Sequence, residues 1–158
     1  MQRCKPIYVK ERGVKMIEKF VKAWDENNKL LLKEFEKNEP IDYKDIVEKL
    51  VTLVLNPYLE ENRFNSDFPN YSLDIDNMTV IDNGDWQGTK IYIIPFDTYQ
   101  PNTSHYVFTH NYYGSCSGCD TFYHIRDDYS TKKEKAKEFH TLALHILQRF
   151  KHLDDDML

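Results

Sequence analysis

The strongest constraint on the fold is the apolar run Thr-Lys-Ile-Tyr-Ile-Ile at residues 89–94. A near-continuous run of this kind is typical of a central strand that neighbouring elements cover. Pro95 terminates it, because proline cannot donate to a strand ladder. Residues 82–88, Asp-Asn-Gly-Asp-Trp-Gln-Gly, come before the run, and their Asn-Gly pair and second glycine favour a turn. Since Thr-Val-Ile at 79–81 precedes that turn, we expect an antiparallel strand pair.

Alternation of apolar and polar residues predicts strands on both sides of this pair. Before it, Tyr71, Leu73 and Ile75 alternate with polar residues, and after it residues 105–113 form the next strand. One face of the later strand carries His105, Val107, Thr109, Asn111 and Tyr113. The short connections predict an antiparallel meander of about three to four strands.

Helical periodicity marks the first third of the chain. Spacings of three and four residues place one stripe on a single helix face. Its members are Val14, Ile17, Val21, Trp24, Asn28, Leu31 and Phe35. The segment Asp-Glu-Asn-Asn at 25–28 predicts a bend between two shorter helices. The alternative is a coiled-coil seam in which Asn28 sets the register, which would allow a dimer through the N-terminal helix.

Two further helices have terminal signals. Asp42 is a good N-cap for a helix that Asn56 and Pro57 are expected to end. Thr131 and Glu134 form a capping-box pattern at the start of the last helix. We therefore predict one α+β domain over residues 1–158. It has helices at 10–56, a central antiparallel sheet at 71–113, a cysteine loop at 114–120 and a C-terminal helix at 131–153 packed on the sheet.

Composition limits the classes of partner and compartment. The net charge of −5 does not favour nonspecific binding to nucleic acid, which needs a basic field. No apolar stretch approaches the roughly 20 residues that span a bilayer, so we expect no membrane partner. Three cysteines, an odd and low count, argue against a secreted disulfide scaffold. We expect a soluble cytoplasmic protein with reduced thiols.

Chemistry, if present, is expected in the segment Gly-Ser-Cys-Ser-Gly-Cys-Asp at 114–120. Its C-x-x-C spacing fits a redox dithiol or a nucleophilic cysteine with His110 as the base. The same thiols are half of a zinc site, for which His110 and His124 are the main further ligands, with Cys4 and His105 as others. Zinc is therefore the one candidate cofactor, and we expect that no cofactor is bound.

Two other interpretations of this segment stay open. Backbone amides of a loop rich in glycine and serine can bind a phosphate, and Tyr112 and Tyr113 could stack on a base. The loop can also be a purely structural connection, in which small cysteine and serine side chains pack.

Two motifs of this chain also resemble those of other proteins. The turn Gly-Asp-Trp-Gln-Gly (84–88), the strand ending at Pro95 and Tyr-Gly-Ser-Cys-Ser-Gly-Cys-Asp (113–120) resemble a group of small, largely uncharacterised phage and bacterial proteins. The likeness covers residues 79–125 and brings no established activity. It implies a phage or mobile-element origin, in the host cytoplasm, where small accessory proteins often inhibit a host defence system, as anti-CRISPR proteins do.

We therefore expect a non-enzymatic binding protein, with a protein partner as the first choice and a small nucleotide as the second. The candidate binding residues are Gly114, Ser115, Cys116, Ser117, Gly118, Cys119, Asp120, Tyr112, Tyr113, Asp85 and Trp86. One alternative is a zinc- or thiol-dependent enzyme centred on Cys116 and Cys119. Another is a nucleotide-binding module or nucleotide sponge.

Overall fold

The computed structural model describes residues 6–63 and 72–156, with side chains from residue 16 to residue 154 within those ranges. It is an α+β fold, as predicted, with N-terminal helices, a four-stranded antiparallel sheet and a C-terminal helix. The helices are α1 (Pro6–Lys37), α2 (Tyr43–Leu50), the π-helical segment η1 (Val51–Leu55), α3 (Asn56–Glu61), α4 (Thr121–Asp127) and α5 (Lys132–Gln148). The strands are β1 (Thr79–Asp82), β2 (Gly88–Pro95), β3 (Tyr106–Tyr113) and β4 (Lys151–His152). Short 3-10 turns occupy η2 (Ile75–Asn77), η3 (Thr103–His105) and η4 (Leu153–Asp156).

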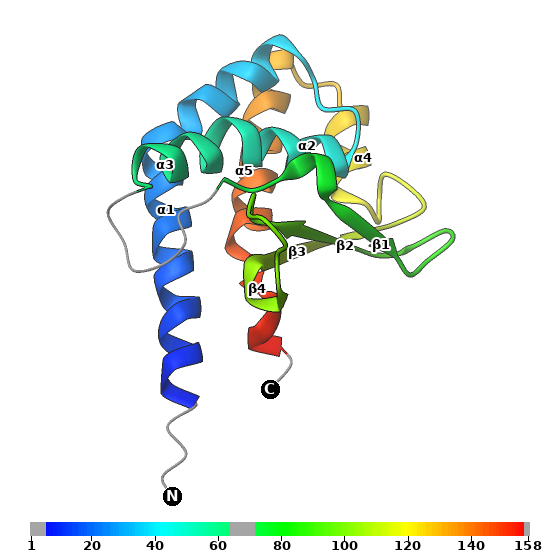
Figure 1. Ribbon diagram of the computed structural model, residues 1–158. Coiled ribbons are helices and arrows are strands. Elements are labelled where there is room, and N and C mark those ends of the chain that lie inside the picture. The colour runs from blue at the N-terminus through cyan, green and yellow to red at the C-terminus, as the bar shows by residue number, and fades with distance from the viewer. Residues whose placement is uncertain (1–5, 64–71, 157–158) are drawn as a thin grey trace, which may run out of the picture.

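The sheet is the predicted antiparallel meander, with strand order β1-β2-β3-β4 and every neighbouring pair antiparallel. Tyr92 lies opposite Thr109 and Ile94 opposite Val107, so all four share one face. That face is buried against the helices, which gather on one side of the sheet in Figure 1. The buried Thr109 hydroxyl donates to the Ile146 carbonyl oxygen at 2.7 Å. This bond ties the sheet to α5.

The expected bend at residues 25–28 is wrong, because α1 is one helix of 32 residues. The asparagine side chains that suggested a bend are satisfied without breaking the helix. Asn28 donates its side-chain amide to the Trp24 carbonyl oxygen at 2.7 Å, and Asn27 donates to the Val54 carbonyl oxygen at 3.2 Å. The N-terminal end of α1 extends beyond the body of the molecule (Figure 1). A dimer through this helix stays a prediction.

The buried stripe of α1 is also displaced by one residue in its first half. The predicted stripe had Ile17 and Val21, but Ile17 is half-buried and Val21 is 45% exposed. Met16, Phe20 and Ala23 are buried instead, before Trp24, Leu31 and Phe35 continue the stripe as predicted. The expected position of Val14 lies outside the described side chains. The displacement turns Phe20 onto Phe150, with ring centroids 5.3 Å apart.

The second helix begins as predicted, since Asp42 caps α2 by accepting from the Asp45 amide. Its predicted end at Asn56–Pro57 is wrong, because the helical path continues through η1 into α3. Pro57 stands in the first turn of α3, where its missing amide is not needed for the hydrogen bonds within α3. Asn56 binds elsewhere: its side-chain oxygen accepts from the Leu73 amide at 2.7 Å, and its nitrogen donates to the Leu73 carbonyl at 3.0 Å.

The strand predicted from Tyr71 to Ile75 is wrong over the residues that the structure describes. Leu73 makes only an isolated bridge to Phe96, and Ile75 begins the turn η2. Tyr71 and the predicted sheet boundary at 71 lie outside the described residues. The sheet proper begins at Thr79.

The last helix starts at its capping box on Thr131, as predicted, but it ends at Gln148 and not at 153. Lys151 and His152 pair with Phe108 and Val107 as the short strand β4. Pairing satisfies backbone groups on the free edge of β3, and local periodicity does not reveal such a partner. Across the described ranges, no helix is long and apolar enough to cross a bilayer.

Candidate binding site at one end of the sheet

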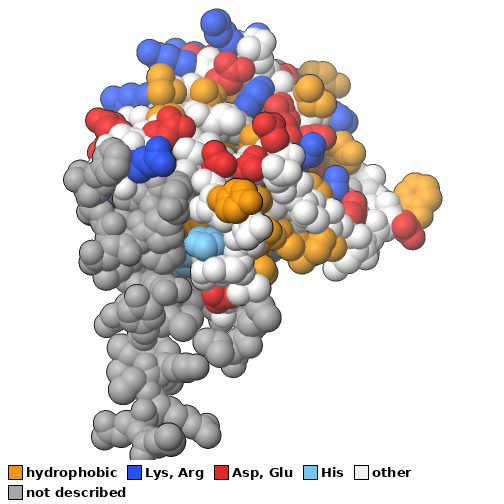
Figure 2. Space-filling model, in the orientation of Figure 1, with side chains coloured by type: hydrophobic (Ala, Val, Ile, Leu, Met, Phe, Trp, Pro, Cys, Tyr) orange, Lys and Arg blue, Asp and Glu red, His pale blue; other side chains and the backbone are white. Residues whose placement is uncertain are grey.

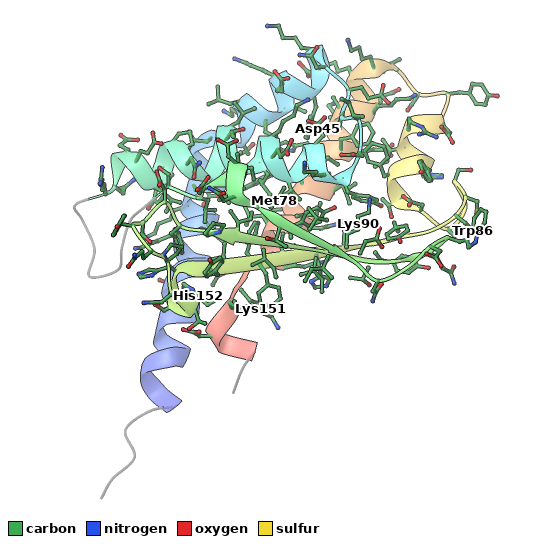
Figure 3. All side chains as sticks on the ribbon, turned by 45° about the vertical axis from the view of Figure 1, so that its right-hand side comes forward. Asp45, Met78, Trp86, Lys90, Lys151 and His152 are labelled. Carbon is green, nitrogen blue, oxygen red and sulfur yellow. The ribbon has the colours of Figure 1, made fainter. Side chains whose placement is uncertain are left out.

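Two loops that the sequence singled out separately lie together at one end of the sheet. Gly88, the first residue of β2, pairs with Tyr113, the last residue of β3. The turn at residues 83–87 and the cysteine loop at 114–120 therefore leave the sheet at the same end. Figure 3 shows Trp86 at this end, beside the yellow trace of the cysteine loop. We call these two loops the sheet end.

Glycines shape the turn between β1 and β2. A side chain on Gly84 would collide with the Gln87 carbonyl oxygen, and one on Gly88 would come within 2.9 Å of the Gly84 Cα. Asn83 closes the turn, because its side-chain oxygen accepts from the Thr89 amide at 2.8 Å. Only residues without a Cβ allow the backbone to approach itself this closely.

Tyr113 fastens this turn to the neighbouring strand. Its hydroxyl lies 2.5 Å from Asp82 Oδ1 and 2.6 Å from the Gly84 carbonyl oxygen. The hydrogen bond with Asp82 raises the pKa of Tyr113 to about 12, and it lowers the pKa of Asp82. The Lys90 ammonium lies 5.3 Å from the centroid of the Tyr113 ring. Tyr113 thus ties the turn to the end of β3.

The fastened turn presents an aromatic side chain to solvent. Trp86 is 81% exposed at its tip, beside the exposed Asp85. Tyr112, at the end of β3, is 53% exposed, and its hydroxyl lies 3.4 Å from Gln87 Oε1. Two of the three predicted aromatic candidates, Trp86 and Tyr112, are therefore exposed, whereas Tyr113 is half-buried.

Asp120 closes the cysteine loop. Its Oδ2 accepts from the Gly114 amide at 2.9 Å, and its Oδ1 accepts from the amides of Phe122 and Tyr123 at 2.8 and 3.3 Å. The carboxylate therefore joins the two ends of the loop and caps α4 at once. A side chain on Gly114 would come within 2.7 Å of Cys119 Sγ.

Cys116 and Cys119 lie side by side on the exposed part of this loop. Both are free thiols, and their sulfur atoms are 2.7 Å apart. The Cys116 amide donates to Cys119 Sγ at 3.1 Å, and the Cys119 amide donates to the Cys116 carbonyl at 3.0 Å. The hydrogen bond from Cys116 lowers the pKa of Cys119. Both side chains are exposed, so they contribute little to the packing of the loop.

The predicted zinc ligands are not gathered. His124 is exposed on α4, while His110 lies within β3 opposite Ile91. Over residues 6–63 and 72–156, no three or more His, Cys, Asp or Glu side chains form a group that could hold a metal ion. Cys4 lies outside these ranges.

Three of the backbone amides proposed to bind a phosphate already donate hydrogen bonds within the loop. The Gly114 amide binds Asp120, the Cys116 amide binds Cys119 Sγ and the Cys119 amide binds the Cys116 carbonyl. A phosphate nest needs successive amides that point outward. The loop therefore offers fewer donors to an anion than its composition suggested.

Two residues at this site, Asp82 and Tyr43, were not among the predicted site residues. Asp82 was expected only as part of a turn, and no prediction was made for Tyr43. The buried Tyr43 hydroxyl donates to Asp120 Oδ1 at 2.9 Å and accepts from the Phe122 amide at 3.1 Å. Asp120 was already among the predicted candidates, whereas no local signal in the sequence marks Tyr43.

No protein-family model, curated protein or solved structure matches this chain.

Proposed function

We propose that the chain is a binding protein that engages a protein partner through the sheet end. The observation that carries the proposal is Trp86, an exposed indole on a turn that is held in place. Exposed tryptophan is enriched among residues that dominate binding energies in protein interfaces. Because Tyr113 and the glycines already fix the turn, a partner would pay little conformational entropy to order it.

The sheet face opposite the helices adds apolar surface to that of Trp86. The register places one set of side chains on that face, and each is half-buried or exposed. They are Ile81, Ile91, Ile93, Phe108 and Tyr112. Figure 2 shows hydrophobic side chains gathered over the strands, below a more highly charged region formed by the helices. Contiguous apolar surface of this kind is typical of protein–protein contacts.

The edge strand β1 supports the same conclusion. It is the first strand of the sheet, all four of its residues are exposed, and its outer edge pairs with no other strand in the part of the chain that the structure describes. Unpaired amides and carbonyls on an edge can add a strand from a partner. The partner that fits has an apolar pocket for the indole and an extended segment that can lie along β1.

The resemblance to small phage and bacterial proteins supplies a setting for such a surface. A phage-encoded inhibitor of a host defence system works by occupying a protein surface and requires no catalytic group. This setting rests on the resemblance alone, and the binding proposal holds without it.

The test uses two exposed aromatic residues at opposite ends of the sheet. Tyr99 is 93% exposed in the connection between β2 and β3, at the far end from Trp86. Photo-crosslinking residues are placed at the exposed positions 85 and 99 in the cells that produce the protein, and the crosslinked proteins are identified by mass spectrometry. A partner that crosslinks from 85 and not from 99, and whose crosslinking from 85 is abolished by Trp86→Ala but not by Tyr99→Ala, supports the proposal. Crosslinks that are equal from both positions contradict it.

A further inference from the structure

The cysteine pair has a chemistry that the binding surface does not use. Cys116 and Cys119 face each other with sulfurs 2.7 Å apart, and both are exposed to solvent. The only other cysteine in the sequence is Cys4. The backbone turn from the Cys119 amide to the Cys116 carbonyl holds the two side chains on one surface.

Four groups surround the Cys119 sulfur. The Cys116 amide lies 3.1 Å away, the Cys116 thiol 2.7 Å away and the Ser115 hydroxyl 3.9 Å away, while the Cys116 carbonyl oxygen accepts from the Cys119 thiol at 3.2 Å. Donors aimed at a sulfur favour its thiolate form, which is the nucleophile in thiol chemistry. The amide and thiol donors therefore favour Cys119 as the thiolate, and the Cys116 thiol lies beside it.

We propose that Cys116 and Cys119 form a reactive dithiol site that exchanges with small disulfides, of which glutathione disulfide is the representative. The Cys119 thiolate attacks one sulfur of the small disulfide, breaks its S–S bond and releases one thiolate. The Cys116 thiolate then attacks Cys119 Sγ and releases the second. The protein loses two electrons and two protons and gains one S–S bond, while the small disulfide is reduced to two thiols.

The surrounding structure confines this reaction to the surface. Asp120 binds the Gly114 amide at one end of the loop and the Phe122 amide at the other. Tyr43, buried beneath, holds the carboxylate from α2. A bond between the two sulfurs therefore changes only the exposed residues 115–119, and the thermal midpoint of unfolding is expected to move little. A disulfide that held the fold together would raise that midpoint strongly.

The test uses the full chain with Cys4→Ser, so that only the pair can react. The protein is incubated with glutathione disulfide at neutral pH and examined by intact-mass spectrometry. We expect the mass of two hydrogens to be lost and both free thiols to disappear together. The Cys116→Ser variant is expected to stop at one bound glutathione on Cys119, because no second thiol resolves it. The Cys119→Ser variant is expected to react more slowly.

Two results would overturn the proposal: the Cys4→Ser protein retains two free thiols, or it gains two bound glutathiones without closing the pair. Faster capture by Cys116→Ser than by Cys119→Ser assigns Cys119 as the attacking thiol, and the reverse order refutes that assignment. A variant that fails to fold is recognised by its circular dichroism. In that case the Cys4→Ser protein, which keeps both thiols of the pair, is treated with methyl methanethiosulfonate, a smaller reagent that reacts with one thiol. Loss of two hydrogens supports the pair, and two bound methylthio groups contradict it. This site is independent of Trp86, so neither proposal stands or falls with the other.

Discussion

Tyr43 and Asp120 are 77 positions apart in the chain, yet the Tyr43 hydroxyl donates to Asp120 Oδ1 at 2.9 Å in the interior. The bond joins the first residue of α2 to the last residue of the cysteine loop. Burial raises the pKa of the Tyr43 hydroxyl, so it stays protonated and donates throughout the physiological range. The sheet end is therefore anchored to the helical layer.

Tyr43→Phe removes this donor and keeps the ring. We expect a loss of about 1.5–3 kcal/mol in the free energy of unfolding, the usual worth of a hydrogen bond to a charged group. Urea denaturation followed by circular dichroism measures it. The control is Tyr129→Phe, since Tyr129 is fully exposed. Equal midpoints for the two variants would show that the anchor contributes nothing.

Gly114→Ala tests the close approach of the cysteine loop. The added methyl would meet the Cys119 carbonyl oxygen at 2.5 Å, whereas at Gly118 the nearest atom is Cys116 Sγ at 3.9 Å. We expect Gly114→Ala to cost about 1–3 kcal/mol of stability, as overpacking does. Gly118→Ala is the matched control and is expected to stay within about 0.5 kcal/mol. A pair of equally stable variants would contradict the geometry.

Tyr113 is expected to ionise late. Its pKa of about 12 lies above that of an ordinary tyrosine, chiefly because of the hydrogen bond with Asp82. A raised pKa in the folded protein means that the bond stabilises the protein below the unfolded value of about 10, and that this stability is lost as the pH rises towards 12. An ultraviolet titration of phenolate follows the change. Asp82→Asn is expected to lower the Tyr113 midpoint, and a midpoint unmoved by that change would refute the assignment.

His140 is expected to make stability depend on pH. Its side chain lies between α1 and α5, with its ring centroid 4.7 Å from that of Trp24 and Nε2 3.0 Å from the Asn28 carbonyl oxygen. Burial lowers its pKa, although the bond to Asn28 opposes the shift. A lowered pKa means that the unfolded chain takes up the proton first. Stability is therefore full above about pH 6.5 and falls as the pH drops through the folded pKa.

This pH dependence is tested by thermal midpoints of unfolding measured between pH 7.5 and pH 5, on both sides of the ordinary histidine pKa of about 6.5. His140→Gln is expected to flatten the slope in that range. His145→Gln, a change at an exposed position of the same helix, is the control and is expected to keep the wild-type slope. His110, whose pKa is also lowered by burial, contributes in the same direction, so some slope will remain. An unchanged slope in His140→Gln would contradict the prediction.

Cys119 is expected to alkylate at lower pH than an ordinary thiol. Its pKa is lowered first by the hydrogen bond from the Cys116 thiol, then by the Cys116 amide. The rate of reaction with iodoacetamide, followed on the Cys119 peptide by mass spectrometry, gives the midpoint. Cys116→Ala removes the thiol donor and is expected to raise that midpoint while the amide donor remains. An identical profile in the variant would show that the neighbouring thiol has no influence.

Local pattern was sufficient for most of the architecture. The apolar run at 89–94, the alternation at 105–113 and the caps at Asp42 and Thr131 correctly predicted two central strands and two helix starts. These signals work because the side-chain period of a strand or helix and the hydrogen bonds of a cap depend on residues only a few positions apart. The two short segments of the candidate site were also found, because their glycines and cysteines are unusual in composition.

Local pattern failed where a distant partner decided the outcome. Asn27 and Asn28 looked like a break in α1, but Val54 and Trp24 accept their side-chain hydrogen bonds. Residues 151–152 looked helical, yet the free edge of β3 captures them. Leu73 looked like part of a strand, and the Asn56 side chain binds its backbone instead.

The sequence by itself determined that Trp86 lies on a glycine-shaped turn and that the two thiols share one loop. Only the tertiary structure decided that these segments meet, through the pairing of Gly88 with Tyr113, and that Tyr43 holds the loop from beneath. The physical reason is that a periodic pattern specifies which face of an element is buried but not what buries it. The partner that satisfies a buried hydroxyl or carboxylate can come from anywhere in the chain that folding brings within 3 Å.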